Sequence, residues 1–248
     1  MLSLPALAAN KSVLHLASLE WAPYVGSHLP DEGLTSAIVK AAAVQAGLET
    51  QISYTPWSRA VQIGLNDPDY AGYFPAFYLK EREKTCYFSA SLGNSIVGFA
   101  HLKDKHFDWK TFADLGTVKI GVVQDYANGE EFDELVKKGA IKTDSAPSDI
   151  SNLRKLMANR VDVIVIGKDV LRQLLITEPS LKNARENIVF HNKELTNFSL
   201  HICFQKNEQG LRLQKAMNVF LEKLNMKKIE GSYFQQLQAS QFNTPPQK

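Results

Sequence analysis

The sequence predicts an α/β protein that is built from two separate units. Strand and helix patterns alternate in the order β-α-β-α-β over residues 13–74, and a second alternation starts at residue 118. Such alternation is typical of parallel strands joined by crossover helices. Two extended segments, 96–103 and 200–206, stand where the chain would leave the first unit and return to it. We therefore expect two α/β lobes joined by a two-strand hinge, with a ligand cleft between them.

The first unit is predicted to contain strands at 13–19, 49–54 and 69–74, and helices at 34–46 and 57–65. The first strand alternates and is rich in β-forming residues. The longer helix carries an apolar stripe that includes Leu34 and Ile38, and Gly47 follows it where a left-handed C-terminal residue belongs. Pro56 stands at the start of the second helix, where the missing N–H needs no partner.

The second unit is predicted to contain strands at 118–123 and 161–166, and helices at 128–138 and 150–158. The first of these helices begins with acidic residues and ends with Lys137 and Lys138, which complements its dipole. Ser148 or Asp149 is suited to cap the second helix. Residues 208–238 are expected to be helical, and the tail after Phe242 to be disordered.

The composition is that of an ordinary globular protein. The chain has 248 residues, a formal charge of +2 and 44% hydrophobic residues. These values exclude disordered, collagen-like, coiled-coil and disulfide-scaffold classes. The near-neutral charge argues against nucleic-acid binding, and no apolar run reaches the roughly 18 residues that a membrane span requires.

The sequence lacks the common signatures of nucleotide, hydrolase and zinc sites, such as the P-loop, G-x-G-x-x-G, G-x-S-x-G, H-E-x-x-H and C-x-x-C. The six histidines are scattered, and the nearest pair, His101 and His106, is interpreted as solvated rather than metal-binding. We expect no cofactor, no metal ion and no enzymatic activity.

The first residues, MLSLPALAAN, are interpreted as the remainder of a truncated signal peptide. Ala6-Leu7-Ala8 fits the small-residue pattern of a cleavage site, although the basic segment that usually precedes it is missing. A short apolar arm is the alternative. Export is compatible with two cysteines, Cys86 and Cys203, which could form one disulfide; two buried free thiols are the favoured interpretation.

Several short motifs, in this order and spacing, resemble the family-3 extracellular solute-binding proteins, the periplasmic receptors that mostly serve polar amino-acid ABC transporters. The resemblance covers residues 11–238. Its pieces are Glu20-Trp21-Ala22-Pro23-Tyr24, Gly33-Leu34, Pro56-Trp57-Ser58-Arg59-Ala60, Glu81-Arg82, Phe88-Ser89, Lys119-Ile120-Gly121-Val122 and Asn159-Arg160-Val161-Asp162. The resemblance implies the type II periplasmic binding-protein fold and a cleft that closes over a small molecule.

The resemblance also implies the residues of the first lobe that bind the ligand. Arg82 stands where the family's arginine pairs with the ligand carboxylate, a task that suits the planar guanidinium. Aromatic walls are expected from Tyr24, Trp57, Tyr73, Phe74 and Phe77, with Tyr24 and Phe77 preferred. The site candidates of the first lobe are Arg82, Tyr24, Trp57, Phe74, Phe77 and Glu20.

The second lobe is expected to contribute the turn that contains Asp125, Tyr126 and Ala127. This turn follows a strand and opens a helix, so its backbone N–H groups suit an anion. Two departures from the family pattern concern a ligand ammonium. The usual small residues of the turn are replaced, and the position of the ammonium-binding aspartate is Gly167, with Asp169 two residues further on. Either Glu20 or Asp125 binds an ammonium instead, or the ligand has none and carries an apolar or aromatic body.

We therefore predict a monomeric periplasmic protein that captures an amino acid or related organic acid and delivers it to an ABC permease or a sensor. Its expected parts are a residual signal segment at 1–9, a first lobe from 10–100 and 206–248, and a second lobe from 101–205. Two alternatives remain from the sequence. One is an enzyme that resembles cyclohexadienyl dehydratases, and the other is a sensory or interaction domain without a small ligand.

Overall fold

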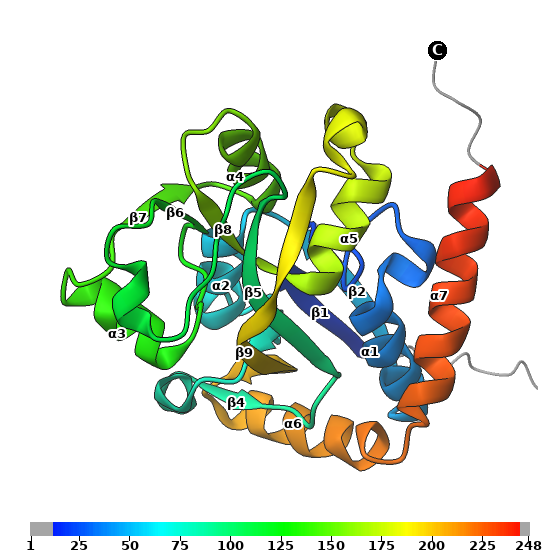
Figure 1. The fold of residues 1–248 in the computed structure, drawn as a ribbon. Coiled ribbons are helices and arrows are strands. Elements are labelled where there is room, and N and C mark those ends of the chain that lie inside the picture. The colour runs from blue at the N-terminus through cyan, green and yellow to red at the C-terminus, as the bar shows by residue number, and fades with distance from the viewer. Residues whose placement is uncertain (1–11, 244–248) are drawn as a thin grey trace, which may run out of the picture.

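Residues 12–243 are described by the computed structural model, in which each of the two predicted units forms its own lobe (Figure 1). The predicted signal segment 1–9 lies outside the described residues, and so do residues 244–248 of the tail predicted after Phe242. In the described part of the chain, no helix is both long and apolar enough to cross a membrane.

Lobe 1 contains a mixed sheet in the order β2-β1-β3-β9, with β4 also paired to β9. Strand β1 lies in the middle and pairs in parallel with β2 and β3, whereas β9 runs antiparallel to β3 and β4. The elements are β1 (Ser12–Ser18), α1 (Leu34–Gln45), β2 (Leu48–Tyr54), α2 (Trp57–Asn66), β3 (Gly72–Phe77), the 3-10 helix η2 (Lys80–Lys84), β4 (Cys86–Phe88) and α6 (Glu208–Leu221).

Lobe 2 continues the strand order as β9-β5-β8-β6-β7. Strand β6 pairs in parallel with β7 and β8, and β5 runs antiparallel to β8 and β9. The elements are β5 (Asn94–Leu102), β6 (Ile120–Val123), α3 (Glu130–Lys137), β7 (Thr143–Ala146), α4 (Asp149–Met157), β8 (Val163–Gly167) and α5 (Lys168–Thr177).

Strand β9 (Ile188–Gln205) belongs to both sheets. Its first part pairs with β5 up to Ser199, and its last part pairs with β3 from Leu200 onward. Because all of β5 pairs within lobe 2, the first crossing between the lobes lies before Asn94, ahead of the predicted segment 96–103. The second crossing, in the middle of β9, adjoins the predicted segment 200–206.

A disulfide joins Cys86 in β4 to Cys203 in β9, with 5.5 Å between the Cα atoms. The expectation of two free thiols is therefore wrong. Cys86 and Cys203 lie on neighbouring antiparallel strands, a relationship that a separation of 117 residues does not reveal.

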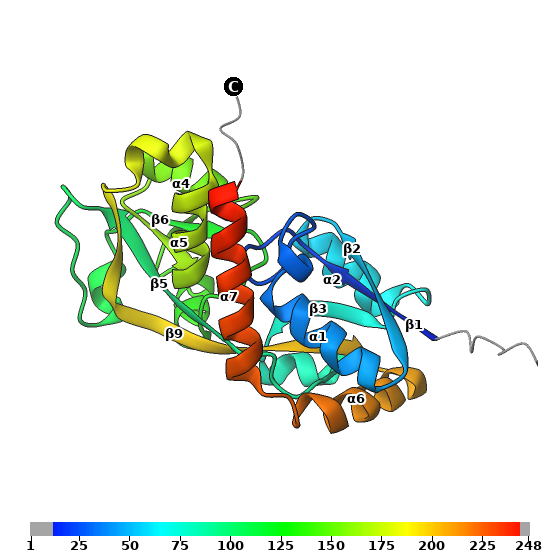
Figure 2. The same cartoon turned by 90° about the vertical axis from the view of Figure 1, so that its right-hand side faces the viewer.

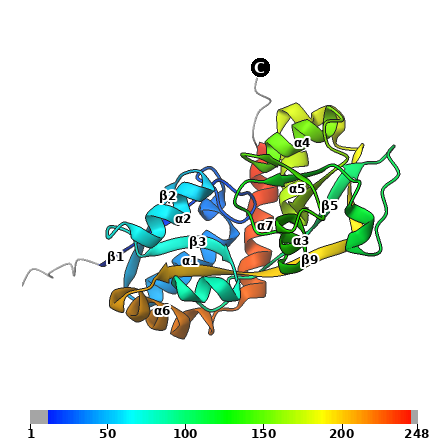
Figure 3. The ribbon, with the colours of Figure 1, turned by 90° about the vertical axis from the view of Figure 1, so that its left-hand side faces the viewer.

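The C-terminal helical region is broken into two helices, α6 and α7 (Met226–Asn243). Helix α7 packs on α1 of lobe 1, and Tyr233 donates its hydroxyl to the Pro23 carbonyl over 2.7 Å. On its other side, α7 and α5 of lobe 2 line a common groove. Figure 2 shows α7 in front of the junction between the lobes, and Figure 3 shows the same junction from the opposite side, with α7 in the middle between the lobes.

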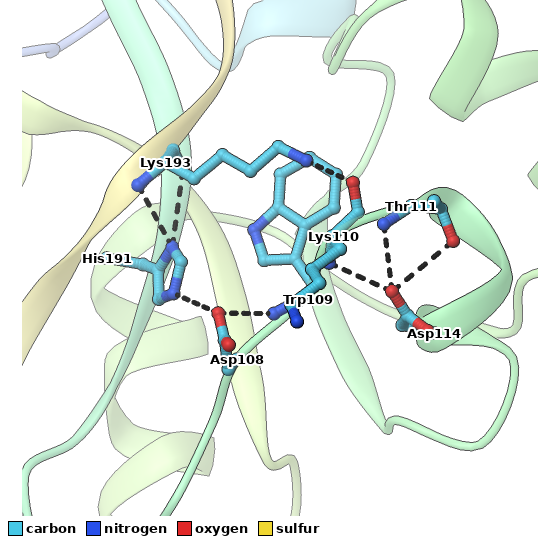
Figure 4. Close-up of polar contacts among 7 residues, drawn as sticks. All are labelled: Asp108, Trp109, Lys110, Thr111, Asp114, His191 and Lys193. Carbon is cyan, nitrogen blue, oxygen red and sulfur yellow. Dashed lines mark hydrogen bonds and ion pairs between the residues drawn. The ribbon is translucent and has the colours of Figure 1, made fainter.

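The loop that follows β5 is fixed to β9 by polar and cation–π contacts (Figure 4). A carboxylate oxygen of Asp108 lies 3.5 Å from the Nε2 atom of His191. The ammonium of Lys193 lies 3.9 Å from the centre of the Trp109 ring and donates to the Lys110 carbonyl. The Trp109 ring is buried in the lobe 2 core, so these contacts close one side of that core.

Candidate functional site

The two lobes enclose a cavity at the carboxyl ends of β1, β3 and β6. Its empty space is about 310 Å³ when the part open to solvent is included. Both lobes supply the lining, which consists of Leu19, Trp21, Trp57, Pro75, Phe77, Arg82, Tyr126 and Ala127. All of these side chains are apolar or aromatic except one guanidinium. We call this space the inner compartment.

Arg82 is the only charged residue of the inner compartment. It lies on η2 and is half-buried, and its Nη1 donates to the Phe77 carbonyl over 3.3 Å. Within residues 12–243, no carboxylate lies within ion-pair distance of this guanidinium. Most of its five N–H donors are therefore available to an anion that enters the cavity.

The aromatic walls come from both lobes. Phe77 stacks on Phe198 with 4.2 Å between ring centres, and Trp21 meets Phe77 edge-on at 5.8 Å. Trp57 of lobe 1 meets Tyr126 of lobe 2 edge-on at 6.1 Å. These packed rings leave few rotamers open, so the walls hold their shape.

Asp125 accepts hydrogen bonds from lobe 1 and so links the two lobes beside the cavity. The Trp57 indole N–H donates to the Asp125 carbonyl over 3.2 Å, and the Ser58 hydroxyl donates to the Asp125 carboxylate. Because Trp57 and Ser58 begin α2 in lobe 1 while Asp125 follows β6 in lobe 2, these bonds form only when the cleft is closed.

A second space adjoins the first and, like it, is partly open to solvent. Its empty volume is about 1090 Å³, including solvent. It shares Leu19, Trp21, Trp57 and Tyr126 with the inner compartment. Its other lining residues are Glu20, Ala22, Tyr54, Thr55, Pro56, Pro147, Ser148, Asp149, Ile150, Val170 and Leu174. We call this space the outer compartment.

Asp149 is the buried acid of the outer compartment. It is the first residue of α4 and only 8% exposed. Burial raises the pKa of its carboxyl to about 7, against the lowering effect of its own backbone N–H and of a hydrogen bond from the Trp21 side chain. A carboxyl with such a pKa is neutral in mildly acidic solution and ionised in mildly alkaline solution.

Of the nine site residues expected from the sequence, five line the inner compartment: Trp57, Phe77, Arg82, Tyr126 and Ala127. Glu20 lies in the outer compartment, where its carboxylate accepts hydrogen bonds from the Ser27 backbone N–H and hydroxyl. Asp125 lies at the bonds between the lobes. The structure thus brings seven of the nine to the cleft.

Tyr24 and Phe74 lie away from both compartments. Phe74 is fully buried, because side chains alternate along β3 and place Pro75 and Phe77 on the cavity side. The Tyr24 hydroxyl donates to the Asp169 carboxylate over 3.1 Å. Asp169 is the acid nearest in sequence to Gly167, the position expected to bind an ammonium. It lies in the first turn of α5, bonded to Tyr24, and lines neither compartment.

Sequence reasoning missed Leu19, Trp21 and Pro75 in the inner compartment and Asp149 in the outer one. A signal for Leu19 and Trp21 was present, because both follow the end of β1, and strand ends of α/β units face the cleft. Asp149 was considered only as a helix cap. Ser148 is in fact the N-cap, and its hydroxyl accepts the Ser151 N–H over 3.3 Å. Asp149 is therefore not the cap, and it lines the outer compartment.

No protein-family model matches the sequence, and no curated protein matches it at a significant level. Solved structures do match. An ancestral arginine-binding protein bound to arginine has a TM-score of 0.74 and 16% identity, with 90% of this chain and 98% of that one covered. The GluR0 ligand-binding core from Nostoc punctiforme, in complex with L-glutamate, has a TM-score of 0.71 and 17% identity, with 90% of this chain and 98% of that one covered.

A third similar structure is a histidine kinase sensor domain with similarity to periplasmic binding proteins. Its TM-score is 0.75 at 14% identity, with 90% of this chain and 96% of that one covered. The chain thus has the two-lobe fold of the periplasmic binding proteins, and both the predicted fold class and the resemblance to solute-binding proteins are confirmed at the level of the fold.

Proposed function

We propose that this two-lobe protein is an exported solute-binding protein. It captures a small carboxylate-bearing molecule between its lobes, and a membrane partner, either an ABC permease or a sensor, recognises the closed form. The observation that carries the proposal is Arg82, an unpaired guanidinium in a cavity that is otherwise apolar and aromatic. Such a group binds a carboxylate through two parallel charge-assisted hydrogen bonds.

Capture by closure fits the way the lobes share the cavity. Lobe 1 supplies Arg82 and most of the walls, whereas lobe 2 supplies Tyr126 and Ala127. A ligand first meets lobe 1 in the open form and is then covered by lobe 2, which excludes water from the ion pair. The bonds at Asp125 stabilise the closed form.

Export is supported by the disulfide between Cys86 and Cys203, because such bonds persist in the periplasm and outside cells but rarely in the cytosol. The fold supports it as well, since one similar structure is described by its likeness to periplasmic binding proteins. The similar structures include both a solute-binding protein and a sensor domain, so the proposal includes either kind of membrane partner.

The test is a thermal-shift screen with amino acids, aromatic acids and dicarboxylates. A ligand present at 100 times its Kd stabilises the folded protein by about 2.7 kcal/mol. Arg82→Ala should abolish this shift. The matched control is Arg212→Ala. Arg212 lies on the exposed face of α6, where it pairs with Glu208, and it lines neither compartment.

A shift that survives Arg82→Ala would contradict the carboxylate assignment. The proposal includes no catalytic step, so prephenate and arogenate should yield no product above background. Turnover of either compound would instead favour the dehydratase interpretation.

A further inference from the structure

Two carboxyl groups line the outer compartment, and within residues 12–243 neither forms an ion pair with a cationic side chain. The lining residues include two acids, Glu20 and Asp149, and no lysine, arginine or histidine. Glu20 is exposed and its carboxylate is occupied by Ser27. Asp149 is more than nine-tenths buried, and its side-chain partner is the neutral indole of Trp21. A buried carboxylate in this position gains most from a cation that enters the cleft.

Aromatic side chains surround the same space. Trp21, Tyr54, Trp57 and Tyr126 all line the outer compartment together with Asp149. The face of an aromatic ring attracts a cation within about 6 Å, most strongly where water is excluded. A carboxyl group combined with indole and phenol rings is therefore the chemistry of a site for an organic cation.

We infer that the outer compartment binds a cationic group of the ligand, an ammonium or a guanidinium, with Asp149 as its counter-ion and the aromatic rings as its walls. This inference rests on the proposed function, in which the carboxylate of the same ligand pairs with Arg82. The compartments adjoin, because they share Leu19, Trp21, Trp57 and Tyr126. A ligand that extends across both would place its carboxylate at Arg82 and its cationic group at Asp149. The ligand class is thus a carboxylic acid with a positive charge several bonds away, such as a basic amino acid.

The test compares charged probes with neutral probes of nearly the same shape. Arginine is paired with citrulline, and lysine with norleucine; agmatine provides the cation without the carboxylate. Isothermal titration calorimetry on the full chain should show at least one cationic probe binding ten-fold or more tightly than its neutral partner. Asp149→Asn should remove this preference. The matched control is Asp104→Asn, which removes the same charge from an exposed loop of lobe 2.

A second measurement uses the unaltered protein, in case Asp149→Asn fails to fold. The titratable groups facing the Asp149 carboxyl are Glu20, Tyr54 and Tyr126, and no basic group lines the space. Burial raises the pKa of Asp149 to about 7, and an adjacent cation lowers it again. Arginine binding at pH 6 should therefore release about one proton, measured by calorimetry in buffers of different ionisation enthalpy, and citrulline should release none.

The outcomes separate this inference from the proposed function. If no cationic probe binds more tightly than its neutral partner, the inference is overturned, whatever the carboxylates do. If carboxylates bind through Arg82 but charged and neutral probes bind equally tightly, the proposed function is supported and the cation site is contradicted. Agmatine binding as tight as arginine binding, retained in Arg82→Ala and lost in Asp149→Asn, would support the cation site. The same result would contradict the assignment of Arg82 to the carboxylate.

Discussion

Burial turns the single carboxyl of Asp149 into a group that titrates near neutrality. The carboxyl is desolvated between the lobes, and this raises its pKa from 3.8 to about 7. In an unfolded chain, the same carboxyl is exposed to water and keeps its ordinary pKa. Between about pH 4 and pH 7 the folded, closed protein therefore binds more protons than the unfolded chain.

The first prediction concerns the pH dependence of stability without ligand. Because the folded state binds the extra proton, the free energy of unfolding should fall as the pH rises from 4 to 7, by up to about 4 kcal/mol. Asp149→Asn should remove this component, which urea unfolding at several pH values would measure. The exposed-loop variant Asp104→Asn should follow the wild type. Parallel curves for wild type and Asp149→Asn would contradict the assignment.

At the scale of residues, the sequence indicated the site in part. Arg82, Phe77 and Trp57 could be found because their motifs resemble those of a known family. Asp149 could not, since its importance comes from a cleft wall that belongs to the other lobe, and no local pattern shows which side chains another lobe will bury. Trp21 was within a quoted motif, yet the motif alone did not distinguish it from its neighbour Tyr24, which packs in the core.

At the scale of elements, local patterns predicted β1, α1, β2 and α2 to within a few residues, because each has a clear periodicity and a recognisable end. The long strand β9 was only partly predicted. Its first part is half-exposed and lacks a regular alternation of buried and exposed residues, since it borders one sheet and continues into another. The break between α6 and α7 was missed because apolar residues continue across it.

The second prediction concerns the disulfide between β4 and β9. Replacing both cysteines by alanine should reduce the free energy of unfolding by about 2–4 kcal/mol, because the unfolded chain loses a long covalent loop. Guanidinium unfolding of the variant and of the wild type, each with and without dithiothreitol, measures this effect. The reductant should destabilise only the wild type. A wild type unaffected by reductant would indicate free thiols.

At the scale of the whole molecule, closure depends on a few bonds between the lobes. Tyr24 joins lobe 1 to Asp169 of α5, while Ser58 and Trp57 join it to Asp125. Helix α7 packs on lobe 1 and flanks α5 on the other side of the junction. The bonds at Asp125 lie at the cleft, so they are the ones that opening must break.

The third prediction concerns this opening. The double variant Ser58→Ala/Asp125→Ala removes the hydroxyl–carboxylate bond, whose loss costs the closed form about 1 kcal/mol or more. Without ligand, its radius of gyration from small-angle X-ray scattering should exceed that of the wild type. Asp144→Ala, which removes a surface ion pair with Lys155 in lobe 2, should leave the radius unchanged. Equal radii for all three proteins would mean that Asp125 does not hold the lobes together.

The position of the disulfide has a consequence for the covalent connectivity of the molecule. Cys86 and Cys203 both lie in lobe 1, and the chain between them makes the whole of lobe 2. Lobe 2 is thus a ring closed at its base by one sulfur–sulfur bond. A protease that cuts one of its surface loops opens this ring without separating the fragments. On a gel, such nicked protein would migrate as one chain until a reductant is added.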